Sequence, residues 1–363
     1  MKVRWIDLGK VGHLRSQCIY HGLAYAHNDT SPDTIVLAIP QEPYICVGHF
    51  QDPKRELDIT YCKENNLPII RRQTGGGAVY IDDNQLFVQW IFSPSSVSSK
   101  VSEKFEYFIR PMVETYRHFG IDAYGYKGHD VHVGGKKIVG TGAARIADAE
   151  VITGNFIRGF DCRHMVGALN LPGDLMRFEV SQGMDQYMTS FTAQLEAVPH
   201  FDEVKSVYRQ KCSDILGMEI YEGSLTDNEL KHIRDLEVKL SDEKWTYSME
   251  HSEKNCRLIK IHAGLWIGHS SVMVNGKSMN LTLRLKEDKV DFLHLDLEGG
   301  MESGLGSRLE TAFRNKNLDD EAIEKEIKHC FSSSYESEEI SAQDFADALN
   351  TIRDEKRKIS GGA

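Results

Sequence analysis

Three consecutive glycines stand between two apolar, β-type runs of the chain and limit what this region can form. Gly75, Gly76 and Gly77 lack the Cβ atoms that would keep a ligand away from the backbone, so their N–H groups are free to bind phosphate or carboxylate oxygens. Arg71 and Arg72 bring positive charge to the same place. A glycine triplet alone is also typical of a structural turn, but with the arginines it indicates an anion-binding site.

A second glycine-spaced segment, residues 134–144, carries Lys137. In such a stretch an ammonium group can lie close to a phosphoryl or carbonyl oxygen without steric competition from its neighbours. The triplet has neither the spacing of a P-loop nor that of the Gly-x-Gly-x-x-Gly dinucleotide fingerprint. The two segments together therefore predict an anion-handling site of another kind.

The apolar periodicity predicts a mixture of helices and short strands. Helices are expected over residues 8–27, 102–119, 202–216, 226–240, 319–330 and 341–352, and strands over 34–39, 44–48, 86–92, 131–139, 151–160, 258–261, 265–267 and 272–274. These elements do not follow the regular βαβα alternation of a doubly wound fold. We therefore expect an α+β protein whose mixed β-sheet is flanked by helices.

A change in the character of the sequence near residue 250 predicts a second domain. The chain has 363 residues, enough for two domains, and the segment 242–255 is polar and charged. We expect a first domain over residues 1–248 and a smaller α+β domain over 249–363. The last residues, 353–363, are expected to form a frayed tail.

Composition excludes several classes of function. A formal net charge of −11 disfavours nonspecific binding to nucleic acid. No run approaches the ~20 apolar residues of a membrane span, and the N-terminus lacks the features of a signal peptide, so we expect a cytoplasmic protein without membrane association. The seven cysteines are scattered and form no Cys-x-x-Cys pair, which argues against a disulfide framework or a zinc site.

The string Arg-Arg-Gln-Thr-Gly-Gly-Gly-Ala-Val-Tyr at 71–80 carries a more specific resemblance. A Gly-His-Phe-Gln turn stands upstream of it, and downstream Asp130 is followed by Gly-Lys-Lys-Ile-Val-Gly at 135–140. Over residues 1–245 these motifs resemble the lipoate-protein ligase family, within the wider group that includes biotin ligases and octanoyltransferases. The C-terminal part is similar to the family's small accessory domain, here fused to the catalytic domain.

The resemblance implies a two-step reaction that uses ATP and Mg²⁺. Lipoate or octanoate attacks the α-phosphate of ATP to give an acyl-adenylate, and a lysine of an acceptor protein then takes the acyl group. Lys137 matches the family's lysine and would polarise both the phosphate and the acyl carbonyl. Asp130 matches the family's Mg²⁺-binding aspartate, and a carboxylate is a hard oxygen ligand suited to that ion.

The remaining site residues that the resemblance implies share the role of pocket wall. They are Arg72, Gly75, Gly76, Gly77, Ala78 and Val79 for the phosphate and acyl intermediate, Gly140, Thr141 and Ala143 for the nucleotide, and Gly48 with Phe50 for the acyl tunnel.

The chain departs from the family pattern at several of these positions. Ile81 stands where the family usually has histidine, and His129 where it has asparagine. The segment Ile-Thr-Gly-Asn at 152–155 replaces an expected His-His-Gly-Thr. These changes indicate a divergent branch and put the acceptor and the acyl preference in doubt.

Three alternative functions compete with ligation. An octanoyl or lipoyl transferase would move the acyl group between carrier proteins without ATP, through a cysteine nucleophile. Cys162 is the only cysteine just downstream of the lysine segment, and no family cysteine signature surrounds it. A biotin ligase is disfavoured because its Gly-Arg-Gly-Arg type of loop is absent, and a binding module without chemistry is the non-enzymatic alternative.

The acceptor is expected to be a small β-rich domain that presents one lysine. The resemblance implies the lipoyl domain of an E2 subunit, the glycine-cleavage H protein, or an H-protein-like lipoate-binding protein, and the departures favour a specialised acceptor. The accessory domain is expected to close over or order the lysine segment during adenylation, because such sites gain from excluding water.

Overall fold

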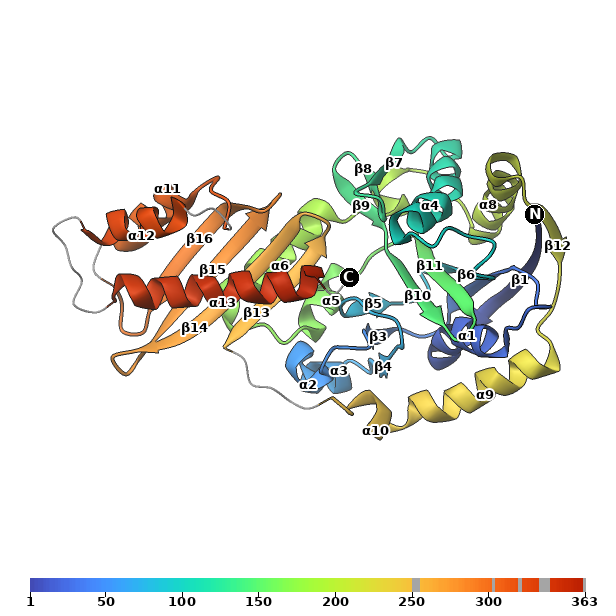
Figure 1. Cartoon of the computed structure of the whole chain (residues 1–363), viewed down its shortest axis with the longest axis horizontal. Coiled ribbons are helices and arrows are strands. Elements are labelled where there is room, and N and C mark those ends of the chain that lie inside the picture. The colour runs from blue at the N-terminus through green and yellow to red at the C-terminus, as the bar shows by residue number, and fades with distance from the viewer. Residues whose placement is uncertain (250–254, 302–303, 319–321, 333–339, 362–363) are drawn as a thin grey trace. The chain divides into compact units, whose positions relative to one another are not determined.

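The computed structural model describes residues 1–249, 255–301, 304–318, 322–332 and 340–361. The chain forms two compact units (Figure 1): the first comprises residues 1–170 and 185–251, and the second comprises 171–184 and 252–363. The sequence predicted the boundary between residues 248 and 249, and that prediction places 171–184 in the first domain. The division into a catalytic and an accessory domain stays a prediction.

A six-stranded mixed sheet forms the centre of the first unit. Its strands lie in the order β10 (Thr141–Ile146), β11 (Ala149–Ile157), β6 (Gln85–Phe92), β2 (Thr34–Pro40), β1 (Lys2–Val11) and β12 (Glu219–Glu222). β1 pairs in parallel with β2 and β12, whereas the other neighbouring strands are antiparallel. This arrangement confirms the mixed sheet predicted from the sequence.

Helices cover both faces of this sheet. They are α1 (His13–Ala26) and α9 (Asp227–Ser241) on one face, and α4 (Val101–His118) and α8 (Phe201–Leu216) on the other. Because side chains alternate along a strand, Ile35 and Leu37 of β2 pack with α4 and α8, while Val36 and Ala38 pack with α1 and α9. Burial on both faces explains why β2 is apolar over nearly its whole length.

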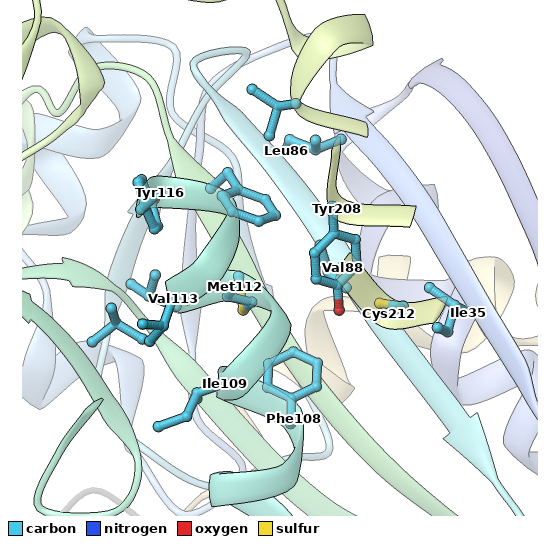
Figure 2. Packing of buried hydrophobic residues seen from close by; sticks show 14 of the residues in the cluster. Ile35, Leu86, Val88, Phe108, Ile109, Met112, Val113, Tyr116, Tyr208 and Cys212 are labelled. Atoms are coloured by element: carbon cyan, nitrogen blue, oxygen red, sulfur yellow. The ribbon is translucent and has the colours of Figure 1, made fainter. Parts of the chain in front are cut away.

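The apolar stripe of α4 packs against the sheet as its helical spacing predicts. Phe108, Met112 and Tyr116 recur at every fourth residue and are fully buried. Figure 2 shows the side chains of α4 and α8 meeting over the sheet, where Tyr208 of α8 also accepts a 3.0 Å hydrogen bond from Trp90 Nε1. The buried tyrosine hydroxyl thus has a partner within the core.

Two small sheets and several short helices complete the first unit. The small sheets have the orders β4 (Ile69–Arg71), β3 (Tyr44–Val47), β5 (Val79–Ile81) and β7 (Ala123–Tyr126), β8 (Asp130–Val133), β9 (Lys136–Val139). The short helices are α2 (Pro53–Glu56), α3 (Ile59–Glu64), α5 (Cys162–Ala168), α7 (Phe191–Gln194) and α10 (Glu243–Thr246). No helix in the described part of the chain is both long and apolar enough to cross a membrane.

The second unit is a four-stranded antiparallel sheet with helices packed on it. Its strands are β13 (Cys256–His262), β14 (Leu265–Val274), β15 (Lys277–Lys286) and β16 (Lys289–Leu297), and its helices are α11 (Leu305–Phe313), α12 (Ala322–Ser332), α13 (Ala342–Gly361) and most of α6 (Gly173–Tyr187). The core residues Leu281, Leu283 and Leu285 alternate along β15. Glu179 of α6 pairs with Arg284 at 2.9 Å.

Several predicted elements need correction. The helix expected from residue 8 begins at His13, because β1 occupies residues 2–11 and Gly12 separates the strand from the helix. The run 131–139 is two strands, since Gly134 and Gly135 have φ of 54° and 81° and form a hairpin turn. The runs 265–267 and 272–274 are one strand, β14. The sequence reading also missed β15, β16 and α6.

The C-terminal tail is not frayed over its described part. α13 continues to Gly361, whereas the predicted helix ended at residue 352. Glu355 is buried, and Lys356 pairs with Asp288 at 2.7 Å. The charged run at 353–358 is typical of a solvated end, and the sequence gives no sign of a distant partner such as Asp288. The first residues of the predicted helix 319–330 and the last two residues of the chain lie outside the described residues.

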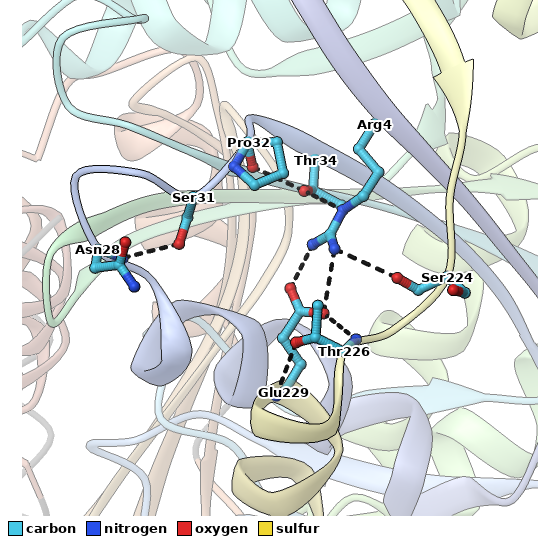
Figure 3. A network of polar contacts seen from close by, with 8 residues as sticks. All are labelled: Arg4, Asn28, Ser31, Pro32, Thr34, Ser224, Thr226 and Glu229. Atoms are coloured by element: carbon cyan, nitrogen blue, oxygen red, sulfur yellow. Dashed lines mark hydrogen bonds and ion pairs between the residues drawn. The ribbon is translucent and has the colours of Figure 1, made fainter.

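A buried ion pair fastens α9 to strand β1 of the large sheet (Figure 3). Arg4 of β1 forms a two-pronged contact with Glu229, and both side chains are about 90% buried, with exposed fractions of 8% and 10%. The Arg4 guanidinium also donates to Thr34 Oγ1 and to the Ser224 carbonyl. Glu229 in turn accepts from the Thr226 N–H and completes the capping box of α9.

The substitution Glu229→Gln should destabilise the first unit by about 3 kcal/mol, because it leaves the Arg4 charge buried without a counter-charge. Urea denaturation measures the change in the free energy of unfolding. The control is Glu219→Gln, which removes the ion pair between Lys2 of β1 and Glu219 of β12, where both side chains are 73% exposed. That change should cost less than about 1 kcal/mol. Equal losses in the two variants would contradict the role given to burial.

Candidate functional site

The glycine triplet forms a loop between β4 and β5 and lies directly against the end of β3. A Cβ atom added to Gly48 would stand 2.0 Å from the carbonyl oxygen of Gly76, so only glycine fits at position 48. The His49 N–H donates to the Thr74 carbonyl at 2.9 Å and ties the two segments together. Gly76 has a φ of 95°, which an L-residue with a side chain rarely adopts.

Arg72 shapes this loop from within. Its guanidinium donates to the carbonyl oxygens of Gly75 and Gly77 at 2.7 and 2.9 Å, and to that of Cys46 at 3.2 Å. The carbonyls of Gly75 and Gly77 are therefore turned toward the arginine. Among the described residues, no acceptor is bonded to the N–H groups of Gly75, Gly76 and Gly77, and all three glycines are exposed. The loop can offer these donors to an anion.

Arg71 points away from the loop and binds α10. Its side chain donates to the carbonyl oxygens of His49 and Trp245 and, at 2.5 Å, to Ser248 Oγ. Trp245 Nε1 donates back to the Arg71 carbonyl at 2.9 Å, and its ring lies under the guanidinium at 5.4 Å. Arg71 is only 2% exposed, so it is a structural clamp rather than a second ligand-facing cation.

A buried histidine supports the entry to the glycine loop. His21 of α1 accepts the Gln73 N–H through Nε2 at 3.2 Å, while Nδ1 lies 2.7 Å from the Gln17 carbonyl. This arrangement requires a neutral ring with its proton on Nδ1. Burial lowers the pKa of His21 to about 4, and the nearby Arg72 and Lys239 charges act in the same direction.

The lysine segment places its ammonium group against a buried carboxylate. Lys137 Nζ lies 2.8 Å from Asp130 Oδ1, and the exposed fractions of the two side chains are 18% and 2%. Burial alone would raise the pKa of Asp130, but the Lys137 charge and hydrogen bonds from His132 and Lys137 outweigh it and hold the pKa well below its usual range. The carboxylate therefore stays ionised and fixes the lysine.

Backbone contacts hold the segment that carries Lys137. β9 pairs with β8 through the Gly134–Gly135 turn, and the Thr189 N–H donates to the Lys137 carbonyl at 2.8 Å. Thr141 Oγ1 donates to the His129 carbonyl at 2.5 Å. The lysine thus projects from a backbone that is fastened on both sides, which favours one position of its ammonium group.

The predicted site residues fall into two groups. One lies around the small sheet of β3, β4 and β5, and the other runs from β8 through β9 to β10. Gly48, Arg72, Gly75, Gly76, Gly77, Ala78 and Val79 belong to the glycine loop and its flanks, and Asp130, Lys137, Gly140, Thr141 and Ala143 to the lysine segment. Phe50 lies at the surface with 76% of its side chain exposed, and its ring packs edge-on against His49. The roles assigned to all of these residues stay predictions.

Two of the departures from the family pattern lie in apolar packing. Ile81 is 4% exposed and packs with Tyr44, Cys46 and Ile70. Ile152 is 1% exposed and belongs to the core beneath α4. The apolar side chains at these positions fill the interior of the unit, where a histidine would need polar partners.

The sequence reading did not assign roles to the supports of the site. Trp245 is the last residue of the region that resembles the family, and His21 lies in a predicted helix, but neither was given a role. No local signal shows their partners, because these lie 174 and 52 residues away. Asp130 was assigned to Mg²⁺, yet its main partner here is Lys137. Among the described residues, no group of three or more His, Cys, Asp or Glu side chains could hold a metal ion.

The lipoyl protein ligase A/B catalytic domain family matches residues 21–213, more than half of the chain, and the chain belongs to that family. It is 24% identical to lipoate-protein ligase A subunit 1 of Thermoplasma acidophilum, over 70% of this chain and 99% of that protein. It is 22% identical to octanoyltransferase LipM of Kyrpidia tusciae, over 67% and 98%. The chain is thus an enzyme of the lipoate ligase and octanoyltransferase class.

Solved structures share its fold. The bipartite lipoate protein ligase of Thermoplasma acidophilum, studied with its E2 lipoyl domain, has a TM-score of 0.63 at 24% identity and covers 70% of this chain and 99% of that chain. A lipoate-protein ligase A bound with ATP has a TM-score of 0.59 at 21% identity, covering 69% and 100%. Plasmodium falciparum LipL1 in complex with lipoate has 0.55 at 14%, covering 97% and 98%.

The substitution Gly48→Ala should displace the glycine loop, because the new methyl group would overlap the Gly76 carbonyl. We expect a loss of about 1–3 kcal/mol in the free energy of unfolding. We also expect faster hydrogen exchange over residues 73–79. The control is Gly12→Ala, where φ is −58° and no heavy atom lies within 4 Å of the added carbon. Wild-type exchange in Gly48→Ala would refute the close contact.

Protonation of His21 should destabilise the first unit in acid. The unfolded imidazole titrates near pH 6.5 and the folded one near pH 4, so only the unfolded chain binds the proton between these values. Stability should therefore fall by about 3 kcal/mol as the pH drops through this window, and it should be unaffected above it. The difference between wild type and His21→Gln in urea denaturation at several pH values isolates this contribution. The exposed His118→Gln variant should follow the wild-type curve.

Proposed function

We propose that this chain is an ATP-dependent lipoate-protein ligase. A carboxylate oxygen of lipoate or octanoate attacks the α-phosphorus of ATP, the bond to pyrophosphate breaks, and the acyl-adenylate forms. The amine of an acceptor lysine then attacks the acyl carbon, AMP leaves with the bonding electron pair, and the amine releases a proton. The observation that carries the proposal is the ammonium group of Lys137, held against a buried carboxylate in a family of acyl-handling enzymes.

Lys137 fits the electrostatic demands of both steps. Negative charge develops on phosphoryl oxygens in the first step and on the acyl oxygen in the second, and a fixed cation stabilises both without reorganisation. Asp130 holds the ammonium at 2.8 Å, and the side chain of Lys137 retains 18% exposure through which a ligand can reach it. The same lysine can therefore serve adenylation and transfer.

The glycine loop supplies donors for the anionic part of the ligand. The exposed N–H groups of Gly75, Gly76 and Gly77 can bind phosphate oxygens, while Arg72 keeps the loop carbonyls turned away. Asp130 would be the protein's ligand to a Mg²⁺ ion that arrives with the nucleotide, since this ion needs only one or two carboxylates besides phosphates and water. When bound, the ion would neutralise phosphate charge.

A transferase that uses an acyl-protein donor is the second candidate, because octanoyltransferases are among the relatives. That route needs an accessible thiolate. Six of the seven cysteines are buried, and burial raises the pKa of Cys46, Cys62 and Cys212. Cys162 is partly exposed, but Lys137 contacts no thiol among the described residues. These features favour adenylation.

The acceptor is proposed to be a lipoyl domain or a related protein with one exposed lysine. The Thermoplasma ligase was studied with its E2 lipoyl domain, which supports an acceptor of this class. The H protein and an H-protein-like lipoate-binding protein present the same chemistry. A panel of all three, incubated with this chain, ATP, Mg²⁺ and lipoate or octanoate, identifies the acceptor by the mass that it gains.

Acyl transfer should require ATP and Mg²⁺ and should release pyrophosphate. The measurement is the intact mass of the acceptor together with a pyrophosphate assay, with and without nucleotide. Acylation from an octanoyl-protein donor in the absence of ATP would overturn the ligase proposal in favour of the transferase. Binding of the acceptor without any mass gain would identify a module that lacks this chemistry.

The substitution Lys137→Met should lower the rate of adenylation by about 100-fold or more, because the transition state loses its fixed cation. Lys136→Met on the same strand is the matched control and should keep wild-type activity. Since Lys137→Met leaves Asp130 buried without its ion pair, the double variant Lys137→Met/Asp130→Asn removes the unpaired charge, with Asp130→Asn alone as the reference for loss of the proposed Mg²⁺ ligand. Full activity in a folded double variant would exclude Lys137 as the catalytic residue.

A further inference from the structure

Two side-chain amides connect the strand after the glycine loop to the end of the lysine segment. Gln85 Nε2 donates to the Tyr80 carbonyl at 3.0 Å, Asn155 Nδ2 donates to Gln85 Oε1 at 2.6 Å, and the Gly140 N–H donates to Asn155 Oδ1 at 3.1 Å. Tyr80 follows the glycine loop on β5, and Gly140 follows Lys137 directly after β9. We call Gln85 and Asn155 the amide relay.

The two backbone ends of the amide relay fix the orientation of both amides. The Gly140 N–H can only donate, so Asn155 must turn Oδ1 toward it and its Nδ2 toward Gln85. The Tyr80 carbonyl can only accept, so Gln85 must turn Nε2 toward it. Both requirements agree on one arrangement, in which each amide uses its oxygen and its nitrogen. All three hydrogen bonds therefore run in the same donor-to-acceptor direction, from the Gly140 N–H to the Tyr80 carbonyl.

The strands of the large sheet bring these side chains together. β6 pairs Gln85 with Ile157 and β11 pairs Asn155 with Phe87, so the two amides are diagonal neighbours on one face of the sheet. Gln85 is 3% exposed. Inside a protein such a hydrogen-bond chain is stronger than in water, and an unpaired amide there is costly. The relay is thus a rigid connection at the centre of the unit.

The backbone at Gly140 lies close to β11, as the hydrogen bond with Asn155 requires. A Cβ atom at Gly140 would lie 3.5 Å from Asn155 Oδ1, and one at Gly154 would lie 2.8 Å from the Phe108 ring and 3.4 Å from the Gly140 carbonyl. The backbone that leaves Lys137 therefore passes close over β11. Asn155 stands in the segment 152–155, which departs from the family pattern, so the contact belongs to this chain's own sequence.

We propose that Gln85 and Asn155 are positioning residues that hold the lysine segment at a fixed place relative to the glycine loop. This inference rests on the proposed function. Neither side chain needs to touch the ligand. The relay acts through Gly140, which directly follows the strand of Lys137, and through Tyr80 on the strand after Gly77, so it sets where the ammonium group meets an anion bound at the loop.

The test compares three nearly isosteric apolar substitutions. Gln85→Met and Asn155→Leu each interrupt the relay. Gln89→Met is the matched control, because Gln89 lies on the same strand, is 1% exposed, and donates to the Ser16 carbonyl of α1 instead. Gln85→Met and Gln89→Met each remove a buried amide, whereas Asn155→Leu removes a partly buried one, and the urea midpoint of each variant shows that it folds.

Only the relay variants should slow the reaction. In pyrophosphate release with lipoate and ATP, we expect kcat to fall about 10- to 100-fold with the KM for ATP within about threefold, because misplacement of a catalytic group affects the chemical step most. Gln89→Met should retain wild-type kcat. The double variant should be no slower than the slower single variant, because both changes break one connection. Wild-type kcat in the relay variants, or an equal loss in Gln89→Met, would overturn the proposal.

A second measurement separates this inference from the proposed function. Hydrogen exchange of the Gly140 amide in the ligand-free protein should be faster in Asn155→Leu than in wild type and unchanged in Gln89→Met. Unchanged exchange in Asn155→Leu would refute the contact, whatever the activity. If the wild-type chain forms no acyl-adenylate, the proposed function fails, while the exchange experiment still decides whether the relay holds the lysine segment.

Discussion

The contact between Lys137 and Asp130 governs the organisation of the site. A carboxylate that is only 2% exposed must be paired or neutralised, and here the lysine ammonium at 2.8 Å keeps it ionised. The lysine must therefore keep one position. Its strand is held by the Gly134–Gly135 turn and by the Thr189 N–H, which donates to the Lys137 carbonyl. A cation on a mobile loop could not serve the same carboxylate with so little exposure.

The glycine loop also presents positive charge, but it does so through backbone N–H groups. The carbonyl oxygens of Gly75 and Gly77 accept hydrogen bonds from the Arg72 guanidinium, so these acceptors are already occupied. The N–H groups of the three glycines remain available as donors. Gly48 makes this possible, because any side chain there would collide with the Gly76 carbonyl. The loop and the lysine segment are thus two preorganised positive regions built by different means, one from backbone dipoles and one from a side-chain charge.

The sequence predicted the features that depend on local patterns. Three strands of the large sheet, β2, β6 and β11, and the helices that cover it follow apolar periodicity, and the glycine loop and Lys137 stood out by residue type, whereas β1, β10 and β12 were not predicted as strands. The sequence did not predict contacts between distant residues. These are the hydrogen bond between Gln85 and Asn155, the clamp between Arg71 and Trp245, and the ion pair between Lys356 of α13 and Asp288. The predicted helix 8–27 includes the last residues of β1 because only Gly12 separates β1 from α1, and α6 was not predicted.

The clamp between Arg71 and Trp245 also has a mechanical consequence. Trp245 and Ser248 are among the last described residues before the chain passes on to β13, and both are bonded to the arginine at the base of the glycine loop. The last helix of the first unit is therefore fastened at the base of the glycine loop. A change at Trp245 would act on Arg71 first and, one residue further along the chain, on the loop itself.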